Sequence, residues 1–128
     1  MAQRVTRITL LVKDQEEALN YYTTFLGFSV VEDQLLGTGK RWLVVAPSGD
    51  TTFGFILALA KEDRQLSRVG DQTGGKVLSV LHTDSFDEDL KRLTDNKVRI
   101  VRGPVEEAWG KVIVFEDLYG NLWDLVGR

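Results

Sequence analysis

One acidic side chain interrupts a strand that is otherwise apolar, and it is the residue best able to do chemistry. Asp124 lies in the run 122–126, whose other members are leucine, tryptophan and valine. Burying an unpaired carboxylate is costly, so Asp124 needs a partner or a task. It could bind a cationic or hydroxyl-bearing ligand, act as a general base, or form a structural ion pair. Asp124 is therefore the candidate catalytic residue.

The other reactive side chains are few. The chain has no cysteine, which excludes a disulfide framework, a thiol nucleophile and a cysteine-based zinc site. His82 is the only histidine, and one histidine does not define a Ser-His-Asp triad. Because side chains alternate along a strand, we expect His82 to lie out of phase with Val77, Ser79 and Leu81. It should point to the helix side, or lie at the strand end, in a structural role.

The three tryptophans have different expected places. Trp123 should belong to the core, because it lies on the strand face opposite Asp124. Trp109 stands beside Gly110 in a loop before a strand, where it could border a pocket or anchor the loop. For Trp42 the sequence leaves core and pocket open.

Bulk properties restrict the class of protein. The chain has 128 residues, a net charge of −3 and a hydrophobic fraction of 43%, as expected for one compact domain spanning 1–128. An acidic balance argues against nucleic-acid binding. The longest apolar run, 53–60, is too short to cross a membrane, and no signal peptide is visible. We therefore expect a soluble, cytoplasmic protein.

The elements that must position Asp124 form two similar series. In the first, Asp14 caps a helix that ends before Gly27. In the second, Asp84 or Ser85 caps a helix that runs to about residue 96. The expected strands are 5–12, 28–32, 42–46 and 52–59 in module one (5–60), then 76–83, 98–101, 111–115 and 121–126 in module two (76–127). A polar connector, 61–75, with a possible short helical turn, joins them.

The two series repeat one pattern, strand-helix-strand-strand-strand. At a spacing of 70 residues Asp14 matches Asp84, and at 66 residues Leu57 matches Trp123. A repeat of this length indicates two fused modules. We expect an α+β fold in which two βαβββ modules form a curved, mixed, mostly antiparallel sheet around a cleft, with the helices outside.

This pattern resembles the vicinal oxygen chelate superfamily, which includes glyoxalase I, extradiol dioxygenases and bleomycin-resistance proteins. The likeness covers essentially the whole chain. It rests on the repeat, on Val12-Lys13-Asp14 followed by Ala18 and Tyr22, on Leu26-Gly27-Phe28, and on the turn Asp117-Leu118-Tyr119-Gly120-Asn121. The resemblance implies the glyoxalase-like fold, whereas the family's chemistry varies.

The resemblance also implies where a metal would bind. Enzymes of the family use four strand positions, usually His, Glu, His and Glu, and here these hold Arg7, Ala58, Val77 and Asp124. Only Asp124 can ligate a metal, and Arg7 would repel one. We therefore expect no metal cofactor, with one divalent metal ion as the alternative. The implied geometry suggests that Arg7 and Asp124 form an ion pair where the metal would sit.

The resulting hypothesis is a metal-free, small-molecule binding protein similar in scaffold to bleomycin-resistance proteins, with an unidentified ligand. The alternative is a lyase, isomerase or dioxygenase that uses Asp124 as a metal ligand or as a base. The resemblance further implies a homodimer, because the family usually completes its cleft between chains. The expected ligand pocket consists of Arg7, Thr9, Ala58, Ser79, Trp109 and Asp124.

Overall fold

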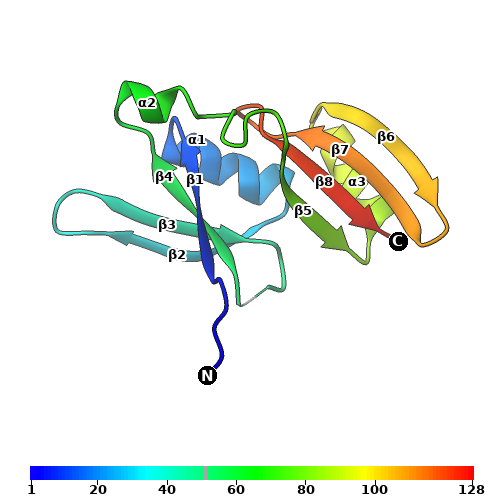
Figure 1. Ribbon diagram of the computed structural model, residues 1–128, viewed down its shortest axis with the longest axis horizontal. Helices are drawn as coiled ribbons and strands as arrows, with labels where there is room; N and C mark the ends of the chain where they lie inside the picture. The colour runs from blue at the N-terminus through cyan, green and yellow to red at the C-terminus, as the bar shows by residue number, and fades with distance from the viewer. Residues whose placement is uncertain (51) are drawn as a thin grey trace. The chain divides into compact units, whose positions relative to one another are not determined.

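The computed structural model describes residues 1–50 and 52–128, and their contacts divide the chain into two units. Unit 1 is Met1–Leu66 and unit 2 is Ser67–Arg128, a division that falls within the segment interpreted as a connector. Each unit holds one four-stranded mixed sheet (Figure 1), so the expected α+β class and repeat are confirmed. Within these described residues, no helix combines the length and apolar character needed to cross a membrane.

Unit 1 has the strand order β1-β4-β3-β2, in which β1 runs parallel to β4 and the other neighbours are antiparallel. Its helix begins as expected: the Asp14 carboxylate accepts a hydrogen bond from the Glu17 amide at 3.0 Å, which satisfies a free helix N–H group. The helical run changes to a π-helical turn at Tyr21 and ends before Gly27, whose φ of 73° favours glycine. The elements of unit 1 are β1 (Arg7–Val12), α1 (Gln15–Asn20), η1 (Tyr21–Phe25), β2 (Ser29–Leu35), β3 (Arg41–Ala46), β4 (Gly54–Leu59) and α2 (Asp63–Leu66).

Strand alternation gives the first sheet one buried face and one open face. The register pairs Leu10 with Leu57, and both are almost fully buried on the face that α1 covers. Burying a side chain of this size stabilises the fold by about 1.5–3 kcal/mol. The register also pairs Thr9 with Ile56 on the opposite face, where Ile56 is half-buried and Thr9 is exposed. α1 and its buried contacts therefore leave a second sheet face available for function.

Unit 2 repeats this topology with the order β5-β8-β7-β6. Phe86 and Leu93 of α3 are buried, together with Phe115 and Trp123. The rings of Phe115 and Trp123 lie 6.2 Å apart with an interplanar angle of 12°, so the expectation that Trp123 is a core residue is confirmed. The elements are β5 (Val77–Thr83), α3 (Phe86–Asp95), β6 (Ile100–Glu107), β7 (Gly110–Glu116) and β8 (Leu122–Gly127).

Two strands are longer than the sequence indicated. β2 continues to Leu35, and β6 continues to Glu107, past the Gly103-Pro104 pair that we expected to begin a loop. In both strands the pairing register shifts, once in β2 and twice in β6. A bulge accommodates the extra residue while the ladder resumes beyond it. In β6 the Gly103-Pro104 pair therefore lies at a bulge within the strand, and the expected ends of both strands were wrong.

A further bulge corrects the expected orientation of β5. The register pairs Val77 with Leu122, then Ser79 with Trp123 and Val80 with Asp124. The shift between Val77 and Ser79 adds one residue and moves every later side chain to the other face. Ser79 therefore shares the buried face of Trp123, and the prediction that it joins Asp124 in a pocket was wrong.

The turn between β7 and β8 is organised by Asp117, which is 6% exposed. Its carboxylate accepts hydrogen bonds from the backbone amides of Tyr119, Gly120 and Asn121, from the Asn121 side-chain amide and from the Trp123 indole, at 2.9–3.2 Å. A buried carboxylate is tolerated when hydrogen bonds replace its water shell. This acid has a structural task, whereas Asp124 lies on the open face.

Candidate functional site

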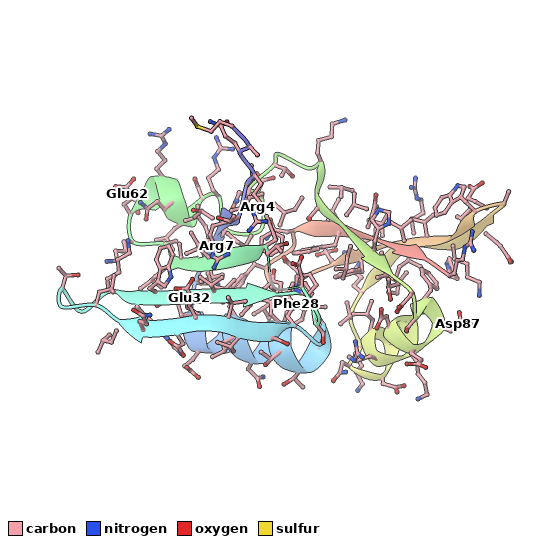
Figure 2. The ribbon with its side chains drawn as sticks, turned by 90° about the horizontal axis from the view of Figure 1, so that it is seen from below. Arg4, Arg7, Phe28, Glu32, Glu62 and Asp87 are labelled. Carbon is pink, nitrogen blue, oxygen red and sulfur yellow. The ribbon has the colours of Figure 1, made fainter. Side chains whose placement is uncertain are left out.

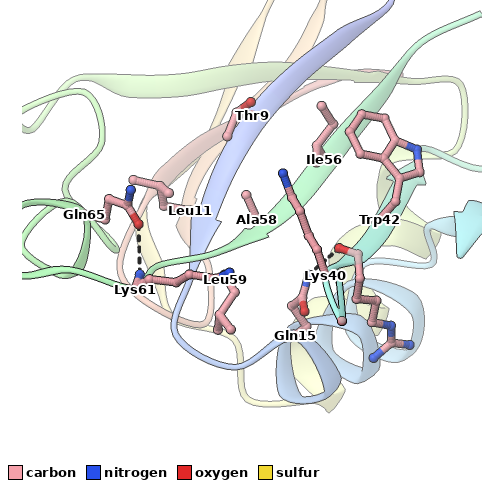
Figure 3. A pocket seen from close by; sticks show the side chains of 12 residues that line it. Thr9, Leu11, Gln15, Lys40, Trp42, Ile56, Ala58, Leu59, Lys61 and Gln65 are labelled. Carbon is pink, nitrogen blue, oxygen red and sulfur yellow. Dashed lines mark hydrogen bonds between the residues drawn. The ribbon is translucent and has the colours of Figure 1, made fainter. Parts of the chain in front are cut away.

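The open face of unit 1 is hollowed. A cavity of about 400 Å³ lies over β1, β4 and β3 (Figure 3). Thr9 and Ala58, both expected in the pocket, line it. So do ten residues that the sequence did not single out for it, namely Leu11, Gln15, Gly39, Lys40, Arg41, Trp42, Ile56, Leu59, Lys61 and Gln65. This hollow is the candidate functional site.

The floor of the hollow is apolar. Ile56 and Ala58 come from β4, and Leu11 from β1 at the position paired with Ala58. The Trp42 side chain rises beside them from β3 and is half-buried. Figure 3 shows these side chains pointing from the sheet into the hollow. Such a floor offers contact area to an apolar or aromatic molecule.

Arg7 and Trp42 are joined through one acid, Glu32. The Arg7 guanidinium donates to Glu32 Oε1 at 2.9 Å, and the Trp42 indole donates to Glu32 Oε2 at 3.1 Å. Figure 2 shows Arg7 on the side of the sheet away from α1. Both carboxylate oxygens are therefore occupied, and the indole ring is held in one orientation.

The Arg7 hydrogen bond is the main cause of a lowered pKa at Glu32. Partial burial works in the opposite direction, while the Trp42 hydrogen bond and the Arg7 charge reinforce the lowering. Glu32 is thus kept as a carboxylate. The network holds its side chains in place, and its positive and negative charges balance beside the hollow.

Gly54 provides room for this network. Arg7 lies on an edge strand, next to Gly54 of β4, and Glu32 lies on the opposite edge strand. A Cβ atom at Gly54 would lie 2.5 Å from Val44 Cγ1 and 3.8 Å from Arg7 Cδ. The missing side chain therefore lets Val44 and Arg7 occupy the middle of the sheet face, across which Arg7 reaches Glu32.

Two glutamines fix the polar wall of the hollow. The Gln15 side chain donates to the backbone oxygens of Leu57 at 2.8 Å and of Arg41 at 3.2 Å, which ties α1 to two strands. The Gln65 carbonyl oxygen accepts from the Lys61 amide at 2.8 Å. Figure 3 draws this bond and the bond from Gln15 to the Arg41 oxygen. Loop and helix side chains are thereby held around the apolar floor.

Unit 2 carries a different open face. Asp124 is half-buried there, beside Val80 on β5 and Val114 on β7. Arg102 of β6 pairs with Val114 from the other side. The acidic Asp124 and the basic Arg102 therefore flank one valine on the same face. Arg7 and Asp124 belong to different units, and their ion pair stays a prediction.

Trp109 and His82 border a second hollow, of about 440 Å³, at one end of this sheet. Trp109 lies in the turn between β6 and β7 and is 51% exposed. The register places His82 opposite Val126, on the Asp124 face. The expectation that His82 points to the helix side was therefore wrong, because it ignored the β5 bulge. The alternative expectation, a place at the strand end, agrees with its position next to the last residue of β5.

The four family positions do not supply a metal-binding donor set. Arg7 is a cation hydrogen-bonded to Glu32, Ala58 and Val77 have no donor atom, and Asp124 is one carboxylate. Metal sites need several oxygen, nitrogen or sulfur ligands in one place. In the part of the chain that the structure describes, no group of three His, Cys, Asp or Glu side chains is arranged to hold a metal ion.

Comparisons with known proteins agree with this fold. The family model described as Glyoxalase/Bleomycin resistance protein/Dioxygenase superfamily matches residues 4–125. An uncharacterised protein of Shewanella frigidimarina is 42% identical over 127 residues, which cover 98% of this chain and 94% of that protein.

Two solved structures are similar over nearly their full lengths. The structure of UcmS2 has a TM-score of 0.84 at 29% identity and covers 98% of each chain. TnmS3, described as an antibiotic binding protein from Streptomyces sp. CB03234, has a TM-score of 0.77 at 30% identity, with 99% of this chain and 97% of that chain covered.

Proposed function

This chain belongs to the glyoxalase/bleomycin resistance protein/dioxygenase superfamily, and from that premise we propose that it binds a small organic molecule without a metal ion. The ligand would lie in the hollow on the open face of β1, β4 and β3. The observation that carries the proposal is the combination of an apolar floor with fixed polar walls in a space of about 400 Å³.

The size and chemistry of the hollow support ligand binding. Small-molecule sites usually have volumes of roughly 300–1,000 Å³ and a mainly apolar lining with a few placed polar groups. Here Trp42 is oriented by Glu32, and Gln15 is fixed by two backbone oxygens. A side chain that is already held in place loses little entropy when a ligand binds.

One of the comparisons supports the binding of a small molecule. TnmS3 is described as an antibiotic binding protein, and its chain is 30% identical to this one. The family positions for a metal hold Arg7, Ala58, Val77 and Asp124, and of these only Asp124 offers a metal ligand. We include a homodimer in the proposal, supported by the family resemblance, and light scattering at micromolar concentration would measure it.

A thermal-shift screen of drug-sized compounds tests the proposal. The variant Ala58→Trp should fill part of the hollow, whereas Ala2→Trp makes the same change in the exposed segment before β1. Compounds that bind in the hollow should raise the melting temperature of the wild type and of Ala2→Trp, but not of Ala58→Trp. If every stabilising compound acts equally on all three proteins, the hollow is not the ligand site.

A further inference from the structure

The hollow of unit 1 has a charge opposite to that of the whole chain. The protein carries a net charge of −3, yet the residues that line the hollow include Lys40, Arg41 and Lys61 and no aspartate or glutamate. A cavity lined by one sign of charge concentrates ligands of the other sign. The local field therefore favours an anion.

Two of these three cations are available to bind a ligand. The Arg41 guanidinium is already bound by Asp33 at 2.8 Å and by Glu16 at 2.7 Å, which raises the pKa of Arg41. Lys40 and Lys61 are exposed at the rim. In Figure 3 the Lys40 side chain extends between Ala58 and Trp42. Within residues 1–50 and 52–128, these two ammonium groups remain to pair with an incoming negative charge.

Glu32, an acid on the same sheet face, does not neutralise them. Glu32 gives one oxygen to Arg7 and the other to Trp42, so its charge is matched by that of Arg7. Gln65 reinforces the preference, because its carbonyl oxygen accepts from the Lys61 amide and its NH₂ group is left to donate. The rim thus offers two cations and a neutral donor above an apolar floor.

From this arrangement we propose that the ligand is a flat aromatic molecule that carries a carboxylate or a comparable anionic group. This inference rests on the proposed function of the same hollow. The ring would lie against Trp42, Ile56 and Ala58, and the anionic group would face Lys40 and Lys61. Charge-assisted hydrogen bonds of this kind are about twice as strong as neutral ones.

A pair of probes that differ only in charge tests the proposal. Isothermal titration calorimetry would compare 2-naphthoate with 2-naphthamide, which has the same ring and no charge. We expect 2-naphthoate to bind roughly tenfold to a hundredfold more tightly, the value of one or two charge-assisted contacts. The preference should weaken as salt is added, because the rim is exposed.

Matched lysine variants locate the effect. The double variant Lys40→Ala/Lys61→Ala should bind the two probes equally, whereas Lys13→Ala removes the same charge from an exposed residue of unit 1 outside the hollow and should keep the preference. An excess of inorganic phosphate should compete only weakly, because phosphate gains nothing from the apolar floor.

Each contrary result has a distinct meaning. If 2-naphthamide binds as tightly as 2-naphthoate, or if the double variant keeps the preference, the anion proposal is overturned while binding in the hollow stands. Strong competition by phosphate overturns the part of the proposal that requires an aromatic ring. If 2-naphthoate does not bind, the anion proposal is also overturned, and the screen with Ala58→Trp reports separately on the binding function.

Discussion

Removing the Asp117 carboxylate should destabilise the protein strongly without touching the hollow of unit 1. Asp117 accepts at least five hydrogen bonds within the β7–β8 turn, from three backbone amides and from the side chains of Asn121 and Trp123. In Asp117→Ala the last two donors would stay buried without an acceptor. Each such group costs about 1–3 kcal/mol.

The expected loss of unfolding free energy is about 3–5 kcal/mol. The estimate takes two buried donors left unpaired and adds a smaller contribution from the three backbone amides, which water can partly reach after the change. For a chain of this size, a loss of that magnitude lowers the melting temperature by about 10–20 °C. Urea unfolding followed by far-ultraviolet circular dichroism measures it, since that signal does not depend on Trp123.

Asp117→Asn is the matched control, because it keeps the shape of the side chain. Its oxygen can still accept from the three backbone amides, while its NH₂ group meets the donors of Asn121 and Trp123. We expect an intermediate loss of about 2 kcal/mol. If Asp117→Ala loses less than about 1 kcal/mol, the turn does not depend on this acid. If the alanine and asparagine variants are equally stable, the two oxygens do not have the separate tasks assigned to them.

Three further outcomes are expected. Glu32→Gln should destabilise the protein at neutral pH. The difference from the wild type should shrink as pH falls below the ordinary Glu pKa of 4.5 and vanish below the lowered folded-state pKa, because the stability that a lowered pKa gives is lost on protonation. A pH series of urea melts in which the difference persists at the lowest pH would contradict the Arg7 pairing. Gly54→Ala should lower the free energy of unfolding by about 1–3 kcal/mol and weaken the binding of any ligand found for the hollow, because its methyl group would displace Val44. Unchanged melting and binding would show that the space is not needed. Elemental analysis of purified protein should find no stoichiometric transition metal in the wild type or in Asp124→Ala, and nickel, zinc, manganese or iron that is present in the first and lost in the second would refute the metal-free proposal.

The repeat and the strand alternation predicted the fold and one face of the site. Once β1 and β4 are recognised as strands, Arg7, Thr9 and Ala58 must share a face, and the register confirms it. The helix start at Asp14 also follows from its side chain alone. These features depend on short-range periodicity, which a single sequence contains.

The remaining site residues depend on features that periodicity does not encode. One extra residue in β5 reversed the expected faces of Ser79 and His82, and an insertion of one residue leaves no clear mark on an apolar strand. Lys40 and Lys61 lie outside the strands, where no alternation fixes the direction of a side chain. Glu32 was visible as a strand residue, but its pairing joins positions 25 residues apart.

The two modules show why the fold was easier to predict than the site. On the buried face the repeat pairs Leu43 with Ile113 and Leu57 with Trp123, apolar in both copies because each copy needs its own core. On the open face the residues that the repeat matches differ in chemistry. Arg7 of unit 1 matches Val77 of unit 2, Glu32 matches Arg102, Trp42 matches Val112, and Ala58 matches Asp124. The second copy thus lacks both the anchored indole and the ion pair that frame the hollow. Packing constrains the buried face in both modules, whereas the open face is free to differ. The ligand site of this protein is therefore to be sought on the open face, where the two copies differ.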